Sequence, residues 1–277
     1  MRVEHLIYGT FPDTPGSQHV IYKSDGVTPE LQNFLINFYD QFGDCKGEEF
    51  KRSVSVCRSC QSPDEELTVV TQVSHHGRDF SGRWGALLRH SAILTLEQYQ
   101  LLSYRPDDIE KHLVSSGTAE ELAHFGDLEI ETTTASPDVA LAIPMGEGAE
   151  GDGLAGYQNS LTALLHGQRL VLYAENNTDY SNRHLRTLVS LLPTSCRKLL
   201  NWSEFAFRPS DDLDLALVYS SRYEAPTAGR LAFAAVGENH LNALALTDEF
   251  INDYLTQLTA ALSQRDWPRL QSLLTSA

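Results

Sequence analysis

The segment that most restricts the fold lies in the second half of the chain, where two apolar runs flank an amphipathic stretch. Residues 169–174 (RLVLYA) and 213–219 have the composition of buried strands. Between them, a helix is predicted from a cap at Ser181 to Pro193, with leucine and valine at helical spacing along one face. The order strand, helix, strand predicts an α/β layer with at least one parallel crossover.

The first half of the chain predicts a more mixed arrangement of strands and short helices. Two antiparallel strand pairs are expected, residues 3–8 with 19–23 and residues 53–57 with 67–73, because these runs are rich in β-branched and aromatic residues and are separated by turn-forming segments. Residues 84–94 fit a strand or a helix equally well.

A stretch rich in glycine and acidic residues, 146–156, divides the chain and is expected to be a loop or linker. We therefore predict an N-terminal mixed α/β part over 1–145 and a C-terminal α/β part over 157–277. Helices are expected over 30–42 and 247–262, the second with an apolar stripe. The fold class is α/β in the broad sense (α+β), with the strand-helix-strand unit followed by C-terminal helices.

The net charge limits the classes of partner. The formal charge is −16 and the sequence pI is about 4.9, so the chain repels phosphate backbones and acidic membrane surfaces, and general nucleic-acid binding is not expected. No apolar run reaches the ~20 residues of a membrane-spanning helix. The opening residues lack the apolar stretch of a secretory signal, which predicts a cytoplasmic protein without membrane insertion.

The densest polar segment runs from His75 to Gly85 and is followed by His90. Within it, Asp79, Arg83 and His90 are the candidates for acid–base or hydrolytic chemistry, since an acid, a guanidinium and an imidazole can share a proton-transfer task. The alternative is structural: an Arg–Asp pair that locks the loop, with His90 as a satisfied polar group nearby.

The cysteines offer a weak candidate metal site. Cys57 and Cys60 form a single CxxC, and Cys45 with His75 could complete four zinc ligands. The second pair of a zinc ribbon is missing, and Cys57 also fits as a buried residue of a strand. The chain contains no GxSxG elbow or Walker A loop. The glycines of 146–156 match the spacing GxGxxG, but acidic residues interrupt them and would repel a phosphate. We therefore expect no cofactor, and a binding protein is favoured over an enzyme.

Three segments resemble the N-terminal domain of the GTPase-associated protein family of bacterial conflict systems. They are HLIYG followed by HVIYKSDG, the block DFSGRWG with a histidine five residues on, and the segment LVSLLPTSCRKLLNWSEFAF (188–207). The residues that carry the first two are Tyr8, Gly9, Ser24, Gly26, Asp79, Gly82, Arg83, Gly85 and His90. A fainter likeness, by hydrophobic pattern alone, links residues 160–195 to DENN domains.

The resemblance implies a non-enzymatic adaptor in an anti-phage defence system, placed between a small GTPase or other NTPase and an effector. Its partners would be other proteins. Two other functions stay open at this point. One is a hydrolase or nuclease-like enzyme using Asp79, Arg83 and His90. The other is a small-ligand sensor with a pocket at the carboxyl ends of the strands predicted over 169–174 and 213–219.

Overall fold

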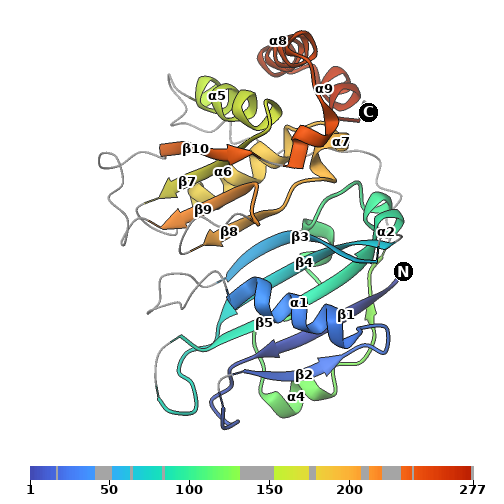
Figure 1. Ribbon diagram of the computed structural model, residues 1–277, viewed down its shortest axis with the longest axis vertical. Coiled ribbons are helices and arrows are strands. Elements are labelled where there is room, and N and C mark those ends of the chain that lie inside the picture. Colours follow the sequence, from blue (N-terminus) through green and yellow to red (C-terminus); the bar gives the residue numbers. More distant parts are fainter. Residues whose placement is uncertain are drawn as a thin grey trace. The chain divides into compact units, whose positions relative to one another are not determined.

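The chain folds into two units of mixed helix and strand, which confirms the predicted fold class (Figure 1). Unit 1 comprises Met1–Thr133 and Asn201–Ser210, and unit 2 comprises Thr134–Leu200 and Asp211–Ala277. The computed structural model describes residues 1–16, 18–40, 52–62, 65–82, 85–131, 153–174, 179–206, 212–219, 232–238 and 240–275.

Unit 1 is built on an antiparallel sheet of the order β8-β3-β4-β5-β1-β2, and the short strand β6 also pairs with β1. Its strands are β1 (Arg2–Gly9), β2 (His19–Lys23), β3 (Arg52–Ser62), β4 (Glu65–His75), β5 (Leu87–Thr95), β6 (Leu128–Glu129) and β8 (Trp202–Ala206). Both predicted strand pairs are confirmed. Residues 84–94, which fitted either element, contain most of β5.

The register of the central strands divides the side chains between two faces of this sheet. Tyr8 of β1 lies opposite Arg89 of β5, and Ile7 lies opposite His90. Neighbouring residues of a strand point to opposite faces, so Arg89 and His90 lie on different sides. We call the side with Tyr8 and Arg89 the helix face, because the Tyr8 hydroxyl donates a hydrogen bond to the Leu35 carbonyl of helix α1.

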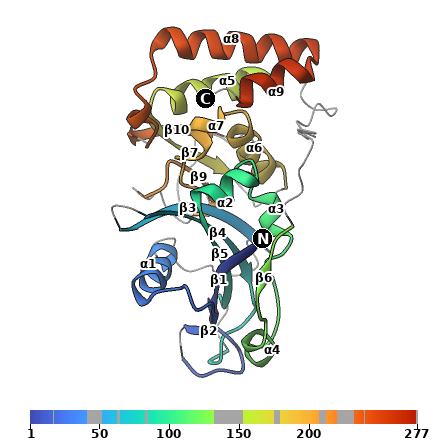
Figure 2. The same cartoon turned by 90° about the vertical axis from the view of Figure 1, so that its right-hand side faces the viewer.

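The opposite side carries His90 and is covered by residues 111–130, which we call the strap. Figure 2 shows α1 on one side of the sheet and the strap, with α4 and β6, on the other. The helices of unit 1 are α1 (Pro29–Asp40), α2 (Leu96–Leu101), α3 (Asp107–Glu110) and α4 (Ala119–Ala123). Helix α4 begins with a capping box in which Thr118 and Glu121 bind each other's backbone amides.

Unit 2 contains the predicted parallel crossover. Strands β7 and β9 pair in parallel with helix α6 between them in the sequence, and β10 pairs antiparallel with β7. The elements of unit 2 are α5 (Gly153–Leu165), β7 (Gln168–Ala174), α6 (Asp179–Ser190), α7 (Thr194–Arg197), β9 (Leu215–Tyr219), β10 (Ala232–Glu238), the 3₁₀ helix η2 (His240–Leu244), α8 (Asp248–Gln264) and α9 (Trp267–Thr275).

The units differ from the predicted division of the chain in two ways. Residues 153–156, expected in a loop or linker, form the first turn of α5, while 146–152 lie outside the described residues. Residues 201–210, expected in the C-terminal part, belong to unit 1, because β8 pairs with β3. The Glu204 carboxylate fixes this pairing by accepting a hydrogen bond of 2.7 Å from the Val54 amide.

None of the described helices is both long and apolar enough to cross a membrane.

Candidate functional site: a buried histidine pair

Two histidines meet on the strap face of unit 1. His5 of β1 and His90 of β5 are both completely buried, with 0% of their surface exposed. The Nδ1 atom of His5 lies 3.1 Å from the Nε2 atom of His90. His90 faces Ile7 across the ladder, two residues along β1 from His5, so the rings are diagonal neighbours on one face of the sheet.

The hydrogen bonds around the pair determine both tautomers. The Val114 amide donates to His90 Nδ1 at 3.0 Å, so a neutral His90 carries its proton on Nε2. That proton is donated to His5 Nδ1, and His5 therefore carries its own proton on Nε2, which donates to the Gly126 carbonyl at 2.8 Å. All four ring nitrogens therefore have a hydrogen-bond partner, and the donors follow one another in one direction, from the Val114 amide to the Gly126 carbonyl.

Burial keeps both rings neutral. Loss of hydration lowers the pKa of His90 to about 3, with a smaller contribution from the neighbouring His5. The pKa of His5 is also lowered by burial, although its hydrogen bond to Gly126 and the charges of Glu4 and Asp127 oppose this shift. A ring that stays neutral and has no free nitrogen cannot act as a general base toward a substrate.

Aromatic rings enclose the histidine pair. Tyr22 stacks on His5 with the ring centroids 4.7 Å apart. Phe125 of the strap makes T-shaped contacts with both histidines, with ring centroids 5.5 Å from His5 and 5.1 Å from His90. These rings exclude water, which is the cause of the lowered pKa values.

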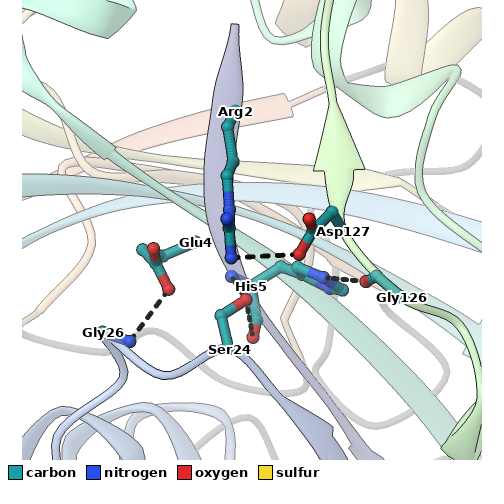
Figure 3. A network of polar contacts seen from close by, with 7 residues as sticks. All are labelled: Arg2, Glu4, His5, Ser24, Gly26, Gly126 and Asp127. Atoms are coloured by element: carbon teal, nitrogen blue, oxygen red, sulfur yellow. Dashed lines mark hydrogen bonds and ion pairs between the residues drawn. The ribbon is translucent and has the colours of Figure 1, made fainter.

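Polar contacts at the edge of the pair hold β1 to its neighbours, as Figure 3 shows. Ser24 Oγ accepts a hydrogen bond from the His5 amide at 2.9 Å and donates to the His5 carbonyl at 3.3 Å. The Gly26 amide donates to a Glu4 carboxylate oxygen at 3.0 Å. A Cβ atom on Gly26 would lie 2.8 Å from the Glu4 carboxyl carbon, so the absence of a side chain permits this contact.

Two further contacts fasten the strap. The Gln72 side chain, in the same cross-strand row as His90, donates to the Val114 carbonyl at 2.9 Å. Arg2 and Asp127 form an ion pair of 3.0 Å (Figure 3). More than half of each charged side chain is exposed, so this pair contributes little, whereas the buried hydrogen bonds contribute more.

Another residue predicted from the opening segment also has a packing role. A Cβ atom on Gly9 would lie 2.2 Å from the Leu87 carbonyl oxygen, so only glycine permits this approach of β1 to β5. Tyr8 and Gly9 thus lie on β1, and His90 lies on β5. Ser24 and Gly26 lie in the turn after β2.

The remaining predicted residues lie in the loop between β4 and β5. The Gly82 amide donates to the Asp79 carbonyl at 2.9 Å, which closes a four-residue turn, and Ser81 donates to the Asp79 carboxylate at 2.7 Å. Arg78 donates to the Gly82 carbonyl at 3.0 Å. Phe80 sits at the tip of this turn with 57% of its surface exposed.

The residues of the hydrolase alternative are therefore placed in different environments. His90 has both nitrogens engaged by His5 and Val114, so it offers none to Asp79. Asp79 lies in the loop, and Arg83 lies outside the described residues. Gly85 has a structural part, since its amide donates to the Gly77 carbonyl at 3.2 Å.

The zinc prediction can be followed only in part. Cys57 is completely buried in β3, and His75 ends β4. Cys45 lies outside the described residues, as does the side chain of Cys60. Among the residues that the structure describes, no group of three or more His, Cys, Asp or Glu side chains is arranged to hold a metal ion.

Sequence reasoning missed His5 as the partner of His90. A histidine within the run VEHLIY occupies an inward position of a strand, and that was the only available signal.

Comparison with protein-family models, with curated proteins and with solved structures found no match for this chain.

Proposed function

We propose that this chain is a non-enzymatic adaptor of a bacterial anti-phage conflict system that binds a GTPase, another NTPase or an effector protein. The segments that resemble the GTPase-associated family are the starting point. The chemistry of unit 1 supports the proposal, because the polar residues of these segments serve to fasten strands and strap together.

One observation carries the proposal: the block from Asp79 to His90 separates into a buried half and an exposed half. The buried half ends in His90, whose nitrogens are both used internally. The exposed half is a turn closed by the Arg78, Ser81 and Gly82 hydrogen bonds. Such a division suits a protein that presents a surface better than one that exposes catalytic groups.

The turn has the properties of a contact point for a protein. Phe80 is a large aromatic side chain that is more than half exposed, and aromatic residues are enriched among those that dominate binding energies. The hydrogen bonds within Arg78–Gly82 hold the turn in one shape, so little conformational entropy is lost when a partner binds.

The test is an affinity purification of the tagged full chain from cells that carry its neighbouring genes, followed by quantitative mass spectrometry. We expect a GTPase, another NTPase or a defence effector to co-purify in a stoichiometric amount. Phe80→Ala should lower that recovery by about tenfold or more, as loss of a dominant aromatic contact does. Leu101→Ala is the matched control, because Leu101 is another exposed apolar side chain, 63% exposed on α2.

Each outcome separates the parts of the proposal. A chain that purifies without any such partner contradicts the adaptor function. A partner that is recovered equally well with Phe80→Ala and with wild type supports the adaptor function and rules out the turn as its contact.

A further inference from the structure

The helix face of unit 1 buries a positive charge. Arg89 of β5 has only 5% of its surface exposed. It lies between Tyr8 of β1 and Val73 of β4 in the cross-strand register. Its guanidinium carbon is 5.4 Å from the centroid of the Tyr8 ring, which is a cation–π distance.

This charge has no counterion in the described part of the chain. The Arg89 side chain takes part in none of the ion pairs and hydrogen bonds there, and its Nε atom is buried without an acceptor. The contact with the Tyr8 ring is therefore its only electrostatic partner among those residues.

Several other polar groups of the helix face are paired with one another or with α1. Thr71 and Ser91 share a hydrogen bond of 2.7 Å between their hydroxyls, and Ser55 and Ser203 share one of 2.8 Å. The Tyr8 hydroxyl donates a hydrogen bond to the Leu35 carbonyl of α1. None of these groups supplies an acceptor to the guanidinium.

Burial of a charge without an opposite charge is strongly unfavourable. Many buried groups avoid that cost by becoming neutral, as His5 and His90 do, but a guanidinium does not lose its proton at any pH a protein survives. A buried polar group without a partner therefore points to a bound ion or molecule.

We propose that Arg89 is the anchor of an oxyanion-binding site on the helix face of unit 1, for a phosphate or carboxylate group. The guanidinium presents a planar fork of N–H donors that matches two oxygens of either group. The face of the Tyr8 ring holds the fork from one side. This site lies across the sheet from the histidine pair and goes beyond the proposed adaptor function.

A competing occupant is a carboxylate of the chain itself. Asp44, Glu48 and Glu49 follow α1 in the sequence and lie outside the described residues. If one of them neutralises Arg89, the site is an internal ion pair. The experiment must separate this case from a bound anion.

The experiment measures the thermal unfolding midpoint of the full chain in inorganic phosphate, in acetate and in chloride at equal ionic strength. We expect phosphate or acetate, but not chloride, to raise the midpoint of the wild type, because a ligand that binds only the folded state stabilises it. Arg89→Met should abolish the rise. Arg78→Met is the matched control, since Arg78 is exposed in the β4–β5 turn, and it should keep the rise.

The buffer without oxyanion gives a second readout. There, Arg89→Met should be at least as stable as the wild type, because it removes an uncompensated charge and keeps the apolar volume. Titration calorimetry of the folded wild type and of Arg89→Lys covers the case in which Arg89→Met does not fold. Lysine keeps the charge but loses the fork, so the affinity for the effective anion should fall about tenfold.

Three results would overturn the proposal. The first is a wild type whose midpoint does not respond to phosphate or acetate and which binds neither by calorimetry. The second is an equal rise in Arg89→Met, which places the anion elsewhere. The third is a loss of stability in the combined variant Asp44→Asn, Glu48→Gln, Glu49→Gln that is absent when the same changes are made in Arg89→Met, which identifies the internal ion pair.

Discussion

The histidine pair and Arg89, which lie on opposite faces of the sheet in unit 1, are buried in opposite ways. On the strap face, His5 and His90 are neutral and each ring nitrogen has a partner. On the helix face, Arg89 stays charged, and no oxygen acceptor among the described residues meets it. A buried network that is fully satisfied specifies the fold, whereas one that lacks a partner indicates where something else binds.

The largest expected effect comes from breaking the hydrogen-bonded histidine pair on the strap face. His90→Ala leaves the Val114 amide and His5 Nδ1 without partners and opens a cavity, so we expect a loss of about 3 kcal/mol or more in the free energy of unfolding of unit 1. Urea denaturation of the variant measures this loss. The cycle with His5→Ala should give a coupling of about 1 kcal/mol or more, and independent, additive losses would show that the two rings do not form one network.

Acid should lower the stability of unit 1 progressively, through the histidine pair of the strap face. Both histidines have a folded-state pKa below the 6.5 of an unfolded histidine, so below pH 6.5 the unfolded chain takes up protons that the folded chain refuses. The stability that the neutral histidine pair contributes is therefore fully present above pH 6.5. It is lost as the pH falls toward the folded pKa of His90, about 3. Within this window the slope from His90 is at most about 1.4 kcal/mol per pH unit, and His5 adds to it in the same direction.

Urea titrations between pH 7 and pH 5 measure that slope, and His90→Gln supplies the comparison. The variant should lose the share of the slope that belongs to His90. The charges of Glu4 and Asp127 oppose the lowering of the His5 pKa, so Glu4→Gln should steepen the acid loss. An unchanged slope in His90→Gln would mean that His90 is protonated in the folded chain.

The smallest effect is expected on the helix face. Tyr8→Phe keeps the ring beneath Arg89 and removes the hydroxyl that donates a hydrogen bond to the Leu35 carbonyl. We expect a loss of about 1 kcal/mol, the typical net contribution of one hydrogen bond, measured by urea denaturation. The response of the midpoint to oxyanions should be the same as in the wild type, and if it vanished, the hydroxyl rather than the ring would belong to the anion site.

Local sequence patterns predicted the strands but not all of their neighbours. The hairpin of β1 and β2 and the crossover of β7 and β9 follow from β-branched runs, turn residues and helical spacing. The ambiguity over 84–94 is resolved by pairing, since β5 lies between β4 and β1 and is hydrogen-bonded on both sides. Such pairing depends on distant segments that periodicity does not detect.

The site residues show the same limit. The sequence singled out His90 but not His5, because their contact spans 85 positions and is made only when β1 meets β5. Strand β8 was missed for the same reason, since its register is set by β3. Arg89 was not expected inside the sheet, because arginine is seldom buried without a partner.

The direction of the histidine hydrogen bonds has a consequence for the strap. The chain of bonds starts at the Val114 amide and ends at the Gly126 carbonyl, and both of these groups belong to the strap. Two side chains of the sheet thus bridge the two ends of one backbone segment, much as a crosslink closes a ring. The residues between 114 and 126 carry the conformational restriction of a closed loop. The loss of either histidine breaks this bridge, while the Gln72–Val114 hydrogen bond and the Arg2–Asp127 ion pair still fasten each end separately.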